Sequence, residues 1–142
     1  MLISDIMNSD VVTVAPDDTV ALAARLLARH NVGSLPVCGG DGRLRGIVTD
    51  RDIVLRCVAG GGSPSSTRVR DVMSRSVITV SPDDDAKRAS ELMSGGQVRR
   101  LPVVQGEKLV GMLALGDLAH TAACHDEAFR ALADISENVR RL

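Results

Sequence analysis

The sequence has almost no aromatic residues: its 142 residues include no Trp and no Tyr, and Phe129 is the single Phe. Proteins that bind single-stranded nucleic acid stack its bases on aromatic side chains, and nucleic-acid binders in general carry a strong basic excess. Here the formal net charge is −1, with acidic and basic residues interspersed. We therefore expect no nucleic-acid partner, and any base that the chain binds must lie against aliphatic side chains and backbone.

Long apolar runs and leader-like features are also missing. No stretch approaches the roughly 20 apolar residues that span a bilayer. The N-terminus lacks the basic and apolar regions of a secretory signal. We therefore expect no membrane association and a cytoplasmic location.

Cysteine is scarce, and its pattern does not indicate a metal site. The three cysteines, Cys38, Cys57 and Cys124, show no CxxC spacing. Cys57 falls within an apolar pattern, so we expect it in the core. A metal or redox role for Cys38 and for Cys124 beside His125 is the alternative to inert thiols, which are the commoner case.

No catalytic constellation is visible. The histidines lie in unrelated contexts, and no Ser or Cys nucleophile is paired with a base. There is no P-loop and no clustered set of carboxylates of the metal-binding kind. We expect a protein that is not an enzyme, has no catalytic residues and requires no obligatory cofactor.

What the sequence does contain is an internal repeat. Asp-Ile-Met at 5–7 recurs as Asp-Val-Met at 71–73, and Leu-Pro-Val at 35–37 recurs at 101–103 with the same offset. A register kept over so many residues indicates two copies of one unit. We assign 1–59 to repeat 1, 60–67 to a linker, 68–124 to repeat 2 and 125–142 to a C-terminal helix.

Each repeat is predicted to have the element order βαββα, which places the chain in the α/β class. An extended Thr-Val segment ends at Pro16 or Pro82, and the acidic residues that follow are good caps for a first helix. A hairpin of 35–38 and 44–49 comes next, and then a second helix from near Asp50 to the glycines at 60–62. The two repeats should pack as one module with an internal pseudo-twofold axis.

The C-terminal helix is amphipathic by pattern, with Phe129, Leu132, Ile135 and Val139 expected along one face. This face either covers the protein's own surface or contacts a dimer mate or partner. The sequence leaves both alternatives open.

These residues resemble the CBS-domain family. The resemblance covers about residues 3 to 123 and rests above all on Val-Gly-Ser-Leu-Pro-Val at 32–37 and on Gly-Ile-Val-Thr-Asp-Arg-Asp-Ile at 46–53, with their counterparts at 98–104 and 111–118. The chain looks like the free-standing bacterial proteins made of one CBS pair, also called a Bateman module, some of which are linked to hypoxia or stress.

The resemblance implies a regulatory, ligand-sensing module. In this family, clefts between paired repeats often bind adenosine-containing ligands: AMP, ADP, ATP, related dinucleotides or S-adenosylmethionine. Carried onto this chain, Asp52 and Asp117 accept hydrogen bonds from ribose hydroxyls, and Thr49 contacts ribose or phosphate. The backbone that frames the adenine is expected at Thr13, Val32, Gly33, Ser34, Leu35, Thr79, Val98, Arg99, Arg100 and Leu101.

The proposed ribose contacts suit Asp52 and Asp117, because a carboxylate accepts from a vicinal diol through two oxygens. The competing interpretation is a capping box, in which Thr49 and Asp52 cap a helix without any ligand. In repeat 2, Ala114 lacks the hydroxyl but Asp117 is kept, which is easier to explain as a ribose ligand than as a cap. We expect unequal sites, with the Asp52 site the tighter.

The arginines 99 and 100 add possible phosphate contacts. Because side chains alternate along a strand, we expect at most one of the two to face a given cleft.

We expect ligand binding to shift the module's conformation, which a protein target or a dimer mate then senses; a homodimer is the expected assembly. The alternatives are a ligand-free, stress-linked structural or interaction protein and a thiol- or metal-responsive switch.

Overall fold

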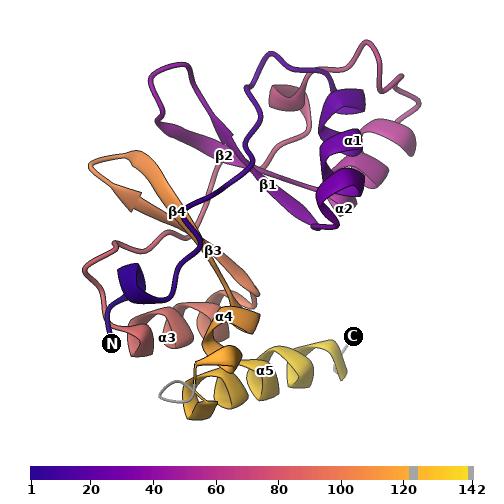
Figure 1. Cartoon of the computed structure of the whole chain (residues 1–142). Coiled ribbons are helices and arrows are strands. Elements are labelled where there is room, and N and C mark those ends of the chain that lie inside the picture. The colour runs from indigo at the N-terminus through magenta and orange to yellow at the C-terminus, as the bar shows by residue number, and fades with distance from the viewer. Residues whose placement is uncertain (122–124, 141–142) are drawn as a thin grey trace. The chain divides into compact units, whose positions relative to one another are not determined.

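The computed structural model describes residues 1–121 and 125–140 (Figure 1). The chain forms two compact units: one is Val12–Val77, and the other combines Met1–Val11 with the chain from Ile78 onward. Each unit contains one antiparallel, two-stranded hairpin. The predicted α/β class with tandem repeats is confirmed.

The unit Val12–Val77 places a helix before its hairpin and a short helical run directly after it. In the hairpin, Ser34 pairs with Thr49, and the register shifts between Val37 and Cys38. The elements of this unit, in chain order, are α1 (Val20–His30), β1 (Ser34–Cys38), β2 (Leu44–Thr49), α2 (Asp50–Asp52), the π-helical η2 (Ile53–Val58) and the 3₁₀ turn η3 (Val69–Asp71). Its core is made almost entirely of small and branched aliphatic side chains, with Cys57 and Met73.

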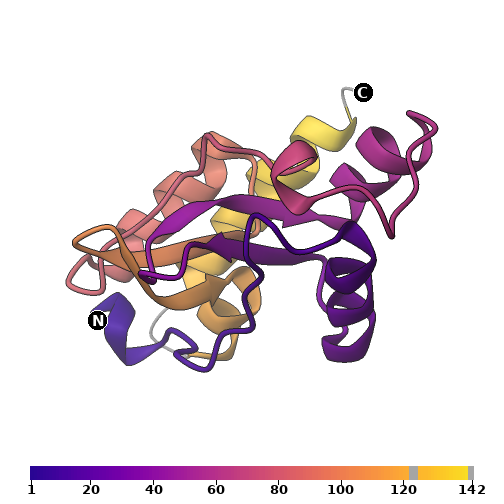
Figure 2. The same cartoon turned by 90° about the horizontal axis from the view of Figure 1, so that it is seen from above.

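The other unit repeats this plan and adds a helix. Its elements, in chain order, are the 3₁₀ turn η1 (Ile3–Asp5), α3 (Ala86–Gly96), β3 (Arg100–Gln105), β4 (Lys108–Ala114), α4 (Leu115–His120) and α5 (His125–Arg140). In the hairpin, Arg100 pairs with Ala114. Helix α5 packs against α3 and α4, and its Ala128, Ala131 and Ile135 are buried in this unit's core (Figure 1 and Figure 2).

The predicted first strand of each repeat is reduced to a single residue pair. Val14 forms an isolated parallel bridge to Val37, and Val80 forms the equivalent bridge to Val103. The extended segments do lie on the hairpins as expected, but their ladder does not continue beyond one pair.

The opening segment of each repeat belongs to the unit of the other repeat. Residues of η1 donate to the backbone just before α3, as in Ile3 N–H to Asp84 O at 2.9 Å, and those of η3 do the same before α1, as in Val69 N–H to Asp18 O at 2.9 Å. The compact units therefore differ from the sequence repeats, since each repeat contributes its Asp-Ile-Met-like opening to the other unit.

In repeat 1, the first helix begins later than the acidic residues predict. Thr19 caps α1, and its side chain accepts from Leu22 N–H at 3.2 Å. Asp18 instead closes a turn by accepting from Ala15 N–H at 2.8 Å. In repeat 2 an acidic cap is present: Asp85 accepts from Lys87 N–H at 2.9 Å, and this bond is the main cause that lowers the pKa of Asp85.

The second helix of repeat 1 begins at Asp50 as predicted. It is α-helical to Asp52, continues as the π-helical η2 and ends at Val58, before the glycines at 60–62. Three of its side chains, Val54, Leu55 and Val58, are exposed. The π-helical spacing of η2 buries Ile53 and Cys57 in the core, which confirms the expected position of Cys57.

The prediction of which residues form the apolar face of the C-terminal helix is wrong for two of them. Phe129 is 75% exposed and Leu132 is 41% exposed, whereas Ile135 is buried. Small alanines, which let helices approach closely, take the inner face in their place. The side chain of Val139 lies outside the described residues.

Among the described residues, no helix is long and apolar enough to cross a membrane.

Candidate functional site

The corner between β2 and α2 holds the most buried carboxylate described in the structure. Asp52 is 9% exposed, and its Oδ2 accepts from Thr49 N–H at 3.0 Å, while Thr49 Oγ1 accepts from Asp52 N–H at 3.0 Å. The capping box that competes with the ligand interpretation is therefore formed. Capping takes only part of the capacity of the carboxylate, which has about four lone-pair sites. Its Oδ1 lies 3.8 Å from the guanidinium of Arg56.

Ser34 gives this corner a feature that capping does not explain. Its Oγ is buried and has no hydrogen-bond partner within the described part of the chain. Ser34 is the strand partner of Thr49. A buried hydroxyl without a partner costs about 1–3 kcal/mol.

Gly33 is next to this corner, but the protein itself does not require glycine there. Its carbonyl accepts from Asp50 N–H at 3.0 Å. An added Cβ meets only the Asp50 carboxylate, at an ordinary contact distance of 3.6 Å. Close approach of a ligand to Gly33 stays a prediction.

The equivalent corner of repeat 2, between β4 and α4, keeps one half of the box. Asp117 Oδ2 accepts from Ala114 N–H at 2.6 Å, while Ala114 has no side-chain oxygen to return the bond. The carboxylate therefore has a capping role even without a threonine. This removes the sequence-based reason for preferring a ribose ligand to explain Asp117.

A hollow of about 390 Å³ lies beside this second corner. It is lined by Arg99, Arg100, Ala114, Leu115, Gly116, Ala119 and Leu132. Both arginines contribute to this lining, although strand alternation predicts at most one of them at a given cleft. Arg99 precedes β3, where its carbonyl accepts from Leu115 N–H at 2.8 Å, so strand alternation does not separate it from Arg100.

The remaining predicted residues divide between the two units. In the unit Val12–Val77, residues 32–35 lie beside Thr49 because β1 pairs with β2; in the other, residues 98–101 lie beside Ala114 through β3 and β4. Leu35 and Leu101 are buried in the cores and offer a ligand only backbone. Val32 and Val98 pack partly against the cores. Thr13 and Thr79 are exposed, and each precedes the valine that bridges to its own unit's hairpin.

The thiols bear on the alternative of a redox or metal switch. Cys38 is free and partly buried, and burial, with a smaller contribution from the Asp41 carboxylate, raises the pKa of its thiol. A raised pKa lowers the fraction of reactive thiolate at neutral pH. Cys124 and the side chain of His125 lie outside the described residues. Within the described ranges, no group of three His, Cys, Asp or Glu side chains is placed to hold a metal.

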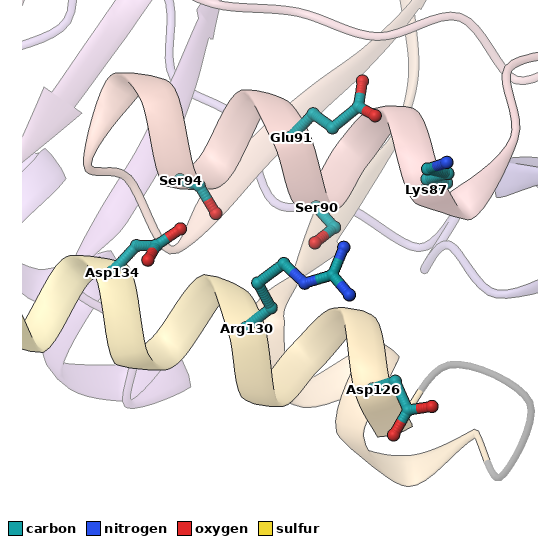
Figure 3. Close-up of a pocket in the computed structure, with 7 residues that line it drawn as sticks. All are labelled: Lys87, Ser90, Glu91, Ser94, Asp126, Arg130 and Asp134. Carbon is teal, nitrogen blue, oxygen red and sulfur yellow. The ribbon is translucent and has the colours of Figure 1, made fainter.

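Sequence reasoning missed a polar groove of about 460 Å³ between α3 and α5. Figure 3 shows its side chains, with Arg130 of α5 directed towards Ser90 of α3. The signal was available as helical spacing: Lys87, Ser90, Glu91 and Ser94 share one face of α3. Acidic and basic groups alternate around it, so the groove has no single charge preference.

Comparison with known proteins identifies the repeats. Residues 3–58 and 69–123 match the family model of the CBS domain. The CBS domain-containing protein YhcV of Bacillus subtilis is 43% identical over 134 residues, which are 94% of this chain and 94% of that protein.

Two solved structures are similar in fold and sequence. The crystal structure of Hypoxic Response Protein I with two coordinated zinc ions aligns with a TM-score of 0.79 and 34% identity, covering 85% of this chain and 99% of that one. The CBS domain pair of protein MJ0100, in complex with 5′-methylthioadenosine and S-adenosylmethionine, aligns with a TM-score of 0.74 and 28% identity, covering 84% of this chain and 97% of that one.

Proposed function

This chain belongs to the CBS domain family, and from that premise we propose that it is a regulatory module, not an enzyme, that binds an adenosine-containing ligand at the corner of Ser34, Thr49 and Asp52. Ligand binding is relayed to a protein target. The observation that carries the proposal is the buried hydroxyl of Ser34, which has no partner among the described residues, on the strand residue that pairs with Thr49; the N–H of Thr49 in turn binds the buried carboxylate of Asp52.

The ribose diol is the group that fits this corner. Two vicinal hydroxyls donate to one carboxylate, and Asp52 has accepting capacity left after the cap to Thr49. A ribose oxygen at Ser34 Oγ satisfies a hydroxyl that has no partner in the described part of the chain. MJ0100 supports this class of ligand, since its CBS pair was solved with two adenosine compounds.

A ligand regulates only if it prefers one conformation of the module over another. We propose that AMP, ADP, ATP or S-adenosylmethionine does so here, with a homodimer as the assembly that responds. The exposed Val54, Leu55 and Val58 on η2 supply apolar surface of the kind that a second copy covers. Light scattering of the wild type and of Val58→Asp tests the dimer, which the variant should dissociate.

The same exposed apolar residues favour the second candidate function, a ligand-free interaction protein. Mass spectrometry of small molecules released from the purified protein separates the two. An adenosine compound released in stoichiometric amount supports the sensor. A protein that releases no such compound, and whose melting temperature does not change when any adenine nucleotide is added, supports the interaction protein.

Ser34→Ala is the variant that tests the ligand site itself. Removing an unsatisfied buried hydroxyl should stabilise the ligand-free protein by about 1 kcal/mol, measured by urea denaturation. The same change should weaken binding of AMP, measured by calorimetry, because the ligand loses its partner. Ser81→Ala, an exchange of a hydroxyl outside both corners, is the control for binding. A ligand-free protein destabilised by Ser34→Ala, with unchanged AMP affinity, contradicts the proposal.

A further inference from the structure

Arg56 has one nitrogen that lies among three oxygens from two parts of the chain. Its Nη1 donates to Val72 O at 2.9 Å and to Met73 O at 3.3 Å. The same nitrogen lies 3.8 Å from Oδ1 of Asp52, four residues earlier. The guanidinium therefore links the carboxylate of the candidate ligand site to the opening segment of repeat 2, at residues 72–74.

The segment 72–74 is held against the strand that leads into the corner. Ser74 N–H donates to Ile47 O at 2.8 Å, and Ile47 N–H donates to Ser74 O at 2.9 Å. Ile47 lies on β2, which ends at the corner. This unit of the chain ends at Val77, three residues after Ser74, and the chain then continues into the other unit. The segment therefore lies on the covalent path from the ligand site to the second half of the molecule.

Repeat 2 keeps the backbone part of this arrangement without the charge. Asn8 and Met112 exchange the equivalent pair of backbone hydrogen bonds, each at 2.9 Å. The residue four positions after Asp117 is Thr121, whose Oγ1 donates to the Asp117 carbonyl at 3.1 Å. A threonine has no charge to offer to a carboxylate. The link through a guanidinium is therefore a property of the first corner and not of the repeat pattern.

A ligand at Asp52 should change how the charge of Arg56 is shared. The guanidinium is attracted by the carboxylate and by two carbonyl groups at once. Ribose hydroxyls that donate to the carboxylate take up part of its accepting capacity, so its attraction for the guanidinium decreases. Nη1 is then left to the carbonyl oxygens of Val72 and Met73, and hydrogen bonds from a charged donor are the stronger kind. The segment 72–74 should therefore be held more firmly when the ligand is bound.

We propose that Arg56 is a positioning residue that couples the ligand site at Asp52 to the segment 72–74. This inference rests on the proposed adenosine-binding function and adds the first step of its relay. Because the counterpart of Arg56 is Thr121, only the first corner transmits its occupancy in this way.

Amide hydrogen exchange of the full chain, followed by NMR with and without AMP, measures this coupling. The N–H groups of Ile47 and Ser74 report on the segment, and those of Asn8 and Met112 report on the equivalent bridge in the other unit. We expect saturating AMP to slow exchange at Ile47 and Ser74 by about tenfold more than at Asn8 and Met112, which is within the range typical of coupling between sites. Stabilisation of the whole protein slows all four alike.

Three variants separate a relay from a structural contact. Arg56→Met removes the charge and keeps much of the aliphatic stem, and Arg56→Lys keeps a charged nitrogen. Arg51→Met, the control, removes an exposed charge from the helical turn just before η2. The side chain of Arg56 is 51% exposed, so none of these changes opens the core.

The ratio of exchange rates without and with AMP is the informative quantity. In Arg56→Met the extra slowing at Ile47 and Ser74 should fall below about twofold. Arg56→Lys should keep about fivefold, and Arg51→Met should keep the tenfold effect of the wild type. A purely structural role of Arg56 speeds exchange by the same factor with and without AMP, and leaves this ratio unchanged.

Calorimetry of AMP binding to the same proteins separates this inference from the proposed function. If the wild type binds AMP, and the extra slowing is absent from it or persists in Arg56→Met, the relay is wrong and the proposed function stands. If the wild type does not bind AMP, both are wrong. Binding of AMP, with extra slowing that is present in the wild type and lost in Arg56→Met, supports the relay.

Discussion

The two repeats place the same carboxylate at the same strand-to-helix corner and surround it with different groups. The corner of Asp52 has a threonine that completes a capping box, a guanidinium at 3.8 Å, and, on the strand residue paired with that threonine, a buried serine hydroxyl without a partner among the described residues. Around Asp117 there is an alanine and half a box, and two arginines line a hollow nearby. A repeat can therefore keep its local backbone geometry while the chemistry offered to a ligand diverges.

Gly46 and Gly111, each three residues before the corner of its repeat, should differ in how well they tolerate a larger residue. Their substitution gives the largest expected effect on stability. A Cβ at Gly46 falls 2.5 Å from the backbone oxygen of Ser74, which cannot move easily; at Gly111 the nearest atom, at 2.7 Å, is the flexible end of Met7. We expect Gly46→Ala to cost about 3 kcal/mol and Gly111→Ala about 1 kcal/mol, as overpacking does in other cores. Urea denaturation measures both. Equal costs contradict the comparison.

A single substitution should give each corner the capping pattern of the other. Thr49→Ala turns the first corner into the second and should cost about 1 kcal/mol, while Ala114→Thr completes the second box and should add up to about the same amount. Thermal unfolding of the two variants measures this. If Ala114→Thr leaves the protein unchanged or weaker, the second corner differs in backbone as well as in chemistry.

The first helices should differ in their response to acid, which is the smallest effect. Asp85 caps α3, and Thr19, which does not titrate, caps α1. Because the folded pKa of Asp85 is lowered from 3.8, mainly by the Lys87 N–H, its stabilising contribution is present above that value and is lost as the pH falls through the folded pKa. Melting temperatures of the wild type and of Asp85→Asn between pH 5 and pH 2.5 test this. The variant should lose less stability in that range, and identical pH profiles count against the assignment.

Much of the architecture could be predicted because it is written in local patterns. The hairpins, the helix after each, and the burial of Cys57 follow from alternation, turn residues and apolar spacing. The exchange of opening segments between the units could not be predicted, because nothing in the Asp-Ile-Met pattern says which hairpin it packs on. The inner face of α5 was missed because alanine gives a weak hydrophobic signal, although its small size is what allows the helix to pack closely.

The backbone arrangement of the candidate corner could be predicted in part, while the surroundings of its side chains depend on tertiary structure. The pairing of β1 with β2 brings Ser34 to Thr49, as the hairpin pattern implies. That the hydroxyl of Ser34 is buried without a partner depends on packing around it, which a motif does not describe. Strand alternation does not separate Arg99 from Arg100, because β3 begins at Arg100, one residue after Arg99.

Calorimetry with AMP on three matched proteins tests the central claim most directly: the wild type, Asp52→Asn and Asp117→Asn. Asparagine can still accept the capping bond through its amide oxygen, so both variants keep the cap but lose the charge and the second accepting oxygen. We predict that Asp52→Asn weakens the tighter binding step by about 20-fold, the loss expected for a hydrogen bond to a charged group, and that Asp117→Asn leaves that step unchanged. A tighter step that survives in Asp52→Asn and is lost in Asp117→Asn contradicts the assignment of the principal ligand site to the first corner.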